Sequence, residues 1–144
     1  MTTARIRFAP DILRRLGEEL NPHPAVGIIE LVKNAYDADA RECTVTLQGV
    51  DQLGGLVEIS DDGDGMTVHQ IEQGWLVLGH SQKDKSRRTR LGRIPAGSKG
   101  LGRLAALRLG RFAHLETRPR SDRTSEYELL IDWKLFDKAS LIDD

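Results

Sequence analysis

The chain has 144 residues, of which 39% are hydrophobic and 30% are charged, and its formal net charge is −1 at pH 7. This length and composition are typical of one folded domain, and they exclude an intrinsically disordered chain. The near-neutral charge excludes a whole-molecule attraction to nucleic acid, and the lack of an apolar run near ~20 residues or of a signal peptide predicts a cytoplasmic protein without a membrane partner.

The first elements in the chain are two predicted helices and a strand. Residues 11–20 follow a proline that suits a first helical turn, and a second helix runs from Pro24 to near Asp39 with apolar residues at helical spacing. Cys43 to Leu47 alternates as a strand. The single cysteine excludes an internal disulfide and a cysteine-based zinc site, and we expect Cys43 to be a buried structural thiol.

A second strand and a glycine-rich turn follow. Leu56 to Ser60 reads as the strand, and Asp61 to Gly65 must be a loop because its glycines and aspartates suit neither helix nor strand. Thr67 suits the N-cap of a short helix with an apolar face that reaches Leu78. Residues 79–98 are polar and basic, which predicts a long functional loop.

The last part of the chain predicts a helix and two strands. Leu101 to Leu109 suits a compact helix, and Arg111 to Thr117 and Glu126 to Trp133 suit strands joined by a polar turn. The order of elements predicts an α+β fold, a two-layer sandwich with helices on one face of a mixed β-sheet.

The second predicted helix carries three polar side chains on one face. Glu30, Asn34 and Asp37 are separated by four and three residues, so they align along the helix. Polar groups on an inward-looking edge cost free energy unless something satisfies them, and a nucleotide with its metal ion would do so. An ordinary solvated helix face is the alternative.

Asp61 lies where the second strand meets its glycine-rich turn. Glycines at 63 and 65 permit positive φ and the close approach of a ligand, and a carboxylate at this place can accept a hydrogen bond from an adenine amino group. A plain acidic turn is one alternative. A calcium loop through Asp62 and Asp64 is another, although no glutamate follows at the usual distance.

The run from Gly97 to Gly102, Gly-Ser-Lys-Gly-Leu-Gly, leads into a predicted helix. Backbone amides at such a helix start bind phosphate well. It is not a Walker A loop, because Lys and Gly stand in a different order and no strand directly precedes it. Alone, such a run is also compatible with a simple turn.

Together the three patterns resemble the GHKL superfamily of gyrase B subunits, heat-shock chaperone ATPases, histidine kinases and mismatch-repair ATPases. They occur in one order, Glu-x3-Asn-x2-Asp, Asp-x-Gly-x-Gly-Met and Gly-x2-Gly-x-Gly, and the resemblance runs from about Pro10 to Trp133. The phrase Lys-Gly-Leu-Gly-Arg-Leu-Ala-Ala looks most like the chaperone, microrchidia and mismatch-repair branch. The resemblance implies a Bergerat-type ATP-binding domain over residues 1–144, with residues 79–98 as its ATP lid.

The resemblance also implies a role for each matched residue, with ATP and Mg²⁺ as ligands. Glu30 would polarise the water that attacks the γ-phosphate, and Asn34 would coordinate the Mg²⁺ ion. Asp37 would support the pocket, and Asp61 would bind the adenine amino group. The other nucleotide contacts would come from the adenine cleft, the lid and the glycine-rich run: Gly63, Gly65, Met66, His80, Ser81, Lys83, Gly97, Ser98, Lys99, Gly100, Leu101 and Gly102.

The chain departs from the family pattern near its end. A late strand with a Gly-Thr pair and the lysine or arginine of a following transducer domain are not found, so we expect a fragment of a longer protein or a shortened relative of the family. For Lys85 to Arg90 a solvated basic loop is the favoured interpretation. A nucleic-acid patch is an alternative there, but interleaved aromatic residues are lacking.

An ATP-hydrolysing conformational switch is the leading interpretation, with ATP or ADP as ligand. Its expected partners are a second copy in an ATP-dependent homodimer, missing C-terminal domains, or a client protein. The alternatives are a non-catalytic nucleotide-binding regulatory module and a histidine kinase catalytic domain. Glu30 argues against the kinase, since phosphotransfer to a side chain needs no water-activating carboxylate.

Overall fold

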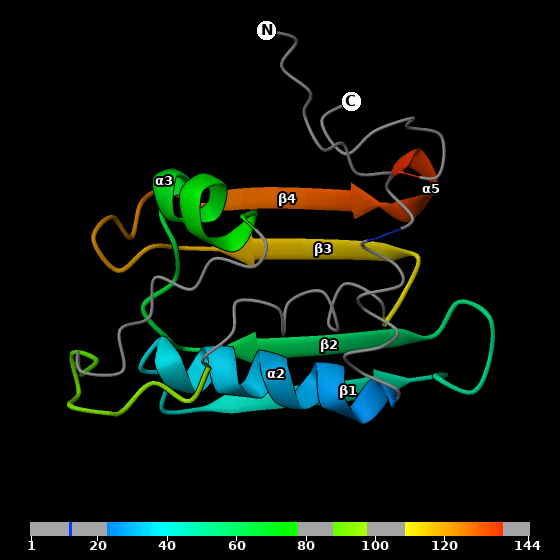
Figure 1. Ribbon diagram of the computed structural model, residues 1–144, viewed down its shortest axis with the longest axis horizontal. Coiled ribbons are helices and arrows are strands. Elements are labelled where there is room, and N and C mark those ends of the chain that lie inside the picture. Colours follow the sequence, from blue (N-terminus) through cyan, green and yellow to red (C-terminus); the bar gives the residue numbers. More distant parts are fainter. Residues whose placement is uncertain (1–11, 13–22, 78–87, 98–108, 137–144) are drawn as a thin grey trace, which may run out of the picture.

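The computed structural model describes residue 12 and residues 23–77, 88–97 and 109–136 (Figure 1). The predicted helix over 11–20, apart from residue 12, and the helix from Leu101 lie outside these ranges. The described elements follow in chain order: α2 Pro24–Asp37, β1 Cys43–Gln48, β2 Leu56–Asp61, α3 Val68–Gln70, η1 Ile71–Trp75, β3 Phe112–Thr117, β4 Tyr127–Asp132 and α5 Trp133–Phe136.

The fold belongs to the predicted α+β class. The strands pair as two antiparallel two-stranded sheets, β1 with β2 and β3 with β4. In Figure 1, α2 and the α3–η1 unit lie on the same side of the strands, as expected for helices on one face. All pairing among the described strands is antiparallel, so the parallel pair that a mixed sheet requires is not among them.

Helix α2 forms where the sequence predicts it. His23 caps its start by accepting a hydrogen bond from the amide of Ala25 at 3.2 Å, and a proline occupies the first turn. Gly27 and Ala35 are the buried positions, and the helix packs on β2. The chain leaves the helix through Asp39, which has a φ of 61°. This left-handed residue stops the helical path and sends the chain into β1.

The helix after β2 begins at the predicted N-cap. The Thr67 hydroxyl accepts from the amide of Gln70 at 3.3 Å, and the Gln70 side chain accepts from the amide of Thr67 at 2.8 Å. This reciprocal pair is a capping box. One short α-helical turn then widens into the π-helical turn η1, in which Ile71 is buried.

Two sequence expectations about strand residues are corrected. Cys43 is exposed rather than buried, because it begins β1 and that strand pairs, among the described strands, with β2 alone. Trp133 does not end the last strand but opens the short helix α5, since β4 stops at Asp132. The Asp132 carboxylate accepts from the amide of Lys134 at 3.0 Å and so starts that helix.

The turn from Gly49 to Gly55 connects β1 and β2. Gly49 and Gly54 have φ values of 53° and 90°, which suit glycine in a tight connection. The amide of Gln52 donates to the carbonyl of Gly49 at 3.0 Å, and Leu53 is fully exposed at the tip. The turn therefore lies at the end of the ladder opposite to Asp61.

No helix within the described ranges is both long enough and apolar enough to cross a bilayer.

Candidate nucleotide-binding site

Asp61 is the last residue of β2, and its side chain organises the turn that follows. Its Oδ1 atom accepts a hydrogen bond from the amide of Gly63 at 2.8 Å. A Cβ atom at position 63 would come within 2.7 Å of this oxygen and 2.8 Å of the carbonyl oxygen of Ala38. Glycine is therefore required at position 63. It lets the backbone amide approach Asp61, and this hydrogen bond holds the exposed Asp61 carboxylate in place.

Asp62 ties the same turn to the start of β1. Its Oδ1 atom accepts from the amides of Arg41 at 2.7 Å and Glu42 at 2.9 Å. These amide bonds, that of Glu42 first, lower the pKa of the Asp62 carboxyl below its usual range. Both backbone donors use Oδ1, so this oxygen of Asp62 ties the turn to the start of β1.

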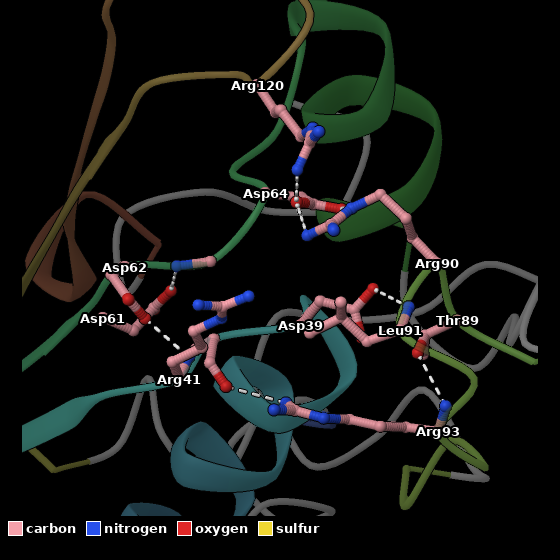
Figure 2. A network of polar contacts seen from close by, with 12 residues as sticks. Asp39, Arg41, Asp61, Asp62, Asp64, Thr89, Arg90, Leu91, Arg93 and Arg120 are labelled. Atoms are coloured by element: carbon pink, nitrogen blue, oxygen red, sulfur yellow. Dashed lines mark hydrogen bonds and ion pairs between the residues drawn. The ribbon is translucent and has the colours of Figure 1, made fainter.

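Asp64 is held by two arginines from distant segments, as Figure 2 shows. The guanidinium of Arg90 donates to both of its oxygens, at 2.8 and 3.2 Å, and that of Arg120 lies 3.8 Å away. The bond to Asp64 is the main reason that the pKa of Arg90 is raised. Two arginines on Asp64 disfavour the calcium-loop alternative, since they supply positive charge where the ion would bind.

Gly65 brings the turn against the segment after β3. Its φ is 64°, and a Cβ atom there would overlap the carbonyl oxygen of Arg118. The carbonyl of Asp64 accepts from the amide of Arg120 at 2.7 Å, and the amide of Met66 donates to the Thr117 hydroxyl at 2.9 Å. An open cleft of about 310 Å³ lies along this contact, lined by Asp64, Gly65, Gln70, Pro119, Arg120 and Ser121.

The polar face of α2 is present, with Glu30, Asn34 and Asp37 all partly buried. Glu30 forms an ion pair through Oε1 with the Lys33 ammonium at 2.6 Å. The two oxygens of Asp37 accept hydrogen bonds from the amides of Ala96 at 2.7 Å and Gly97 at 3.1 Å. Asp37 therefore joins the first glycine of the Gly-x2-Gly-x-Gly run to the helix.

The turn after Asp61 meets the same end of α2, because the amide of Asp64 donates to the carbonyl of Ala38 at 2.7 Å. The structure thus brings together Asp37, Gly97 and the turn that holds Asp61, Gly63, Gly65 and Met66. The remaining predicted contacts lie outside the described residues: His80, Ser81, Lys83, Ser98, Lys99, Gly100, Leu101 and Gly102.

Sequence reasoning missed the residues that hold segment 88–97 on α2. Arg93 donates to the carbonyls of Tyr36 at 3.1 Å and Ala40 at 2.7 Å, and its guanidinium lies 4.7 Å from the centre of the Tyr36 ring. Asp39 accepts from the amide of Leu91 at 3.0 Å. An aspartate just after a helix is a local signal for a left-handed residue, but no local signal names its partner.

Asp39 is ionised more readily than an ordinary aspartate. Burial acts to raise its pKa, but the Thr89 hydroxyl, the Leu91 amide and the charges of Arg90 and Arg93 outweigh burial and lower it. Likewise Arg90 is not a simple solvated base, since it pairs with Asp64. Arg88 and Arg90 are exposed, as a solvated loop predicts, but Arg90 is also bound to Asp64; Lys85 to Arg87 lie outside the described residues.

Residues 22–142 match the family described as histidine kinase-, DNA gyrase B- and HSP90-like ATPase. The chain belongs to this family of ATPases. The match covers both helix α2 and the Asp61 turn, which are the elements that form the site.

Three curated relatives agree with this assignment. A putative type II restriction enzyme, HgiDII of Herpetosiphon aurantiacus, is 30% identical over 76% of the chain and 17% of its own length. The DNA mismatch repair protein MutL of Acidiphilium cryptum is 40% identical over 45% of the chain and 11% of its own length. MutL of Beijerinckia indica is 36% identical over 46% of the chain and 10% of its length. The MutL relatives support the mismatch-repair branch, and the chain spans less than a fifth of each relative.

The donor set on α2 fits a magnesium ion that arrives with a nucleotide. Mg²⁺ takes oxygen ligands and keeps several waters beside substrate phosphates, and the partly buried Asn34 would offer it one amide oxygen. Within the described part of the chain, His114, Glu116 and Glu128 also place ligand atoms within 4.8 Å of one another. These three side chains are exposed and pair among themselves, and none belongs to this site.

Proposed function

We propose that this domain binds Mg-ATP and hydrolyses it within a longer protein, so that nucleotide state sets its conformation. The meeting of the first two motifs with Gly97, the first residue of the third, at the end of α2 carries the proposal. Asp37 binds the amides of Ala96 and Gly97, and the Asp61 turn is bonded to Ala38. Segments up to 60 positions apart in sequence therefore meet where α2 ends.

In this proposal each motif takes one part of the nucleotide. Asp61 accepts a hydrogen bond from the adenine amino group, and Gly63, Gly65 and Met66 shape the cleft around the base. The glycine-rich run that begins at Gly97 supplies backbone amides to the phosphates. Asn34 contributes one oxygen to the Mg²⁺ ion, which neutralises phosphate charge.

The hydrolytic step is assigned to Glu30. Its carboxylate takes a proton from water as the water oxygen bonds to the γ-phosphorus, and the bond from that phosphorus to the β–γ bridging oxygen breaks. The products are ADP and inorganic phosphate. Lys33 is bonded to one Glu30 oxygen, Oε1, so the carboxylate can be held in place while the other oxygen receives the proton.

Binding is tested by titration calorimetry of the 144-residue chain with Mg-ATP. We expect saturable heat in the wild type and its loss in Asp61→Asn, because the amide presents a donor where adenine also presents one. The matched control is Asp51→Asn, a change of the same chemistry in the exposed β1–β2 turn. Equal affinity in Asp61→Asn and the wild type would remove Asp61 from the site.

Turnover is tested by phosphate release under the same conditions. Glu30→Gln should retain ATP binding and lose hydrolysis by about 100-fold or more, the usual contribution of a general base. ATP binding without phosphate release from the wild type would favour the regulatory module instead. Phosphohistidine formed on an added protein would favour the kinase.

The family relationship also supports an ATP-dependent homodimer as the partner. Light scattering with a slowly hydrolysed ATP analogue should show a doubling of mass that Asp61→Asn does not. A mass that stays that of one chain at saturating analogue would restrict the proposal to a monomeric switch.

A further inference from the structure

Asp39 combines three features that are each costly in a folded protein. Its φ of 61° is left-handed, its side chain is 4% exposed, and its Oδ1 atom has no hydrogen-bond partner among the described residues. Among these residues it is the only non-glycine with positive φ. A buried carboxylate with one oxygen that has no partner among the described residues indicates a task that outweighs its cost.

That task is visible in what the other oxygen does. Oδ2 of Asp39 accepts from the amide of Leu91, at the tip of a turn closed on itself by two bonds between Thr89 and Arg93. The amide of Thr89 donates to the carbonyl of Arg93 at 2.9 Å, and the amide of Arg93 donates to the Thr89 hydroxyl at 3.0 Å. Figure 2 shows Asp39 pointing at this turn.

The turn reaches back to the residues on either side of Asp39. The Arg93 guanidinium donates to the carbonyl of Tyr36, three residues before Asp39, and to that of Ala40, one residue after it. The end of α2 and the turn are therefore joined in both directions. Asp39 accepts from the turn, and the carbonyls of Tyr36 and Ala40 accept from Arg93. Three residues after Arg93, the chain enters the contact between Asp37 and the amides of Ala96 and Gly97.

We propose that Asp39 is a positioning residue for phosphate binding: it anchors the 89–93 turn to the end of α2 and so sets the place of Ala96 and Gly97, where the glycine-rich motif begins. This inference rests on the proposed function, because it assigns that run to the phosphates. The adenine end of the site, at Asp61, is held by separate bonds, so loss of Asp39 should affect phosphate binding selectively.

The test compares Asp39→Gly, Asp39→Asn and the wild type. Glycine tolerates the left-handed backbone and removes the carboxylate without adding strain. Asparagine also tolerates that backbone and keeps an oxygen that can accept from Leu91. The control is Asp51→Gly in the exposed β1–β2 turn, and thermal unfolding confirms that each variant is folded.

The first readout is amide hydrogen exchange without nucleotide. In Asp39→Gly the amides of Leu91, Ala96 and Gly97 should exchange about tenfold faster or more. Loss of one hydrogen bond to a charged group makes local opening easier, and the exchange rate rises by that order. Asp39→Asn should remain within a few-fold of the wild type. Unchanged exchange in Asp39→Gly would overturn the anchoring role.

The second readout compares dissociation constants for ATP and AMP. Asp39→Gly should weaken Mg-ATP about tenfold and leave AMP within about twofold, because AMP lacks the β- and γ-phosphates that the run would hold. Equal weakening of both would show general destabilisation and overturn the positioning role. If the wild type binds neither nucleotide, the proposed function and the phosphate part of this inference both fail, while hydrogen exchange still decides the anchor.

Discussion

The aspartates around the end of α2 differ in role because they differ in the donors that surround them. Asp62 accepts two backbone amides, Asp64 pairs with two arginines, and Asp37 bridges to the glycine-rich run. Asp61 remains exposed with one oxygen bonded to its own turn. Of these carboxylates, Asp61 is the one that we propose as the acceptor for the ligand.

At the residue scale, the charge of Asp61 also acts on the thiol opposite it. Cys43 is the register partner of Asp61, and desolvation of the sulfur, together with the Asp61 charge, raises the pKa of the thiol. Because only the thiolate reacts, alkylation near pH ~8 should be slow. Asp61→Asn lowers this pKa and should speed reaction with iodoacetamide, followed by mass spectrometry. Equal rates in both proteins would show that the two groups do not interact.

Gly65 makes a second residue-scale prediction, for stability. Gly65→Ala combines a left-handed φ with overlap on the Arg118 carbonyl and should lower the free energy of unfolding by about 2–4 kcal/mol. Gly92 is the matched control, because its φ is 81° and no atom lies within 4 Å of an added Cβ. Gly92→Ala should cost only about 1–2 kcal/mol in urea unfolding. Equal losses would show that the overlap relaxes.

At the element scale, Arg93 acts as a cap for α2. One nitrogen of its guanidinium, Nη1, bonds two carbonyls while the planar group lies over the Tyr36 ring, and an ammonium group cannot reproduce this stacking. Arg93→Lys should therefore lower the free energy of unfolding by about 1–3 kcal/mol. Arg88→Lys, which changes one exposed bond to Gly92, should shift it by less than about 0.5 kcal/mol. An Arg93→Lys variant with the same free energy of unfolding as the wild type would contradict the capping role.

The elements that sequence could predict are those with local signals. Periodic apolar residues mark α2, alternation marks β1, and Thr67 marks the next helix start. The anchors of segment 88–97 have no such signal, because Asp39 and Leu91 lie 52 positions apart and meet only in the fold. Cys43 was misjudged for a related reason, since an apolar alternation does not tell an edge strand from a central one.

The candidate site shows the same division. Asp37 and the Asp61 turn could be predicted from motif spacing, and the structure brings them together at Ala38. The link between Asp64 and Arg90 could not, because Asp64 occupies a variable place in the motif and Arg90 resembled any solvated base. Residues within a motif can be predicted from sequence, whereas the contacts that hold the motif in place depend on the tertiary fold.

At the scale of the whole molecule, binding to the folded state should raise stability. At a hundredfold excess of Mg-ATP over its Kd the gain is about 2.7 kcal/mol, which for a chain of this size is roughly a 5–10 °C rise in Tm. Differential scanning fluorimetry should show this shift in the wild type and in Glu30→Gln, but not in Asp61→Asn. A shift that survives in Asp61→Asn would place the nucleotide elsewhere.

The β1–β2 turn is a suitable place to attach a label or a tether to the domain. Leu53 is fully exposed at its tip, and the six-residue ladder separates the turn from Asp61 by roughly 17 Å at the usual rise per residue. A Leu53→Cys, Cys43→Ser chain would carry one reactive thiol for a fluorescent dye or a surface tether. Single-molecule recordings could then follow the domain from its far end without touching the residues assigned to the nucleotide.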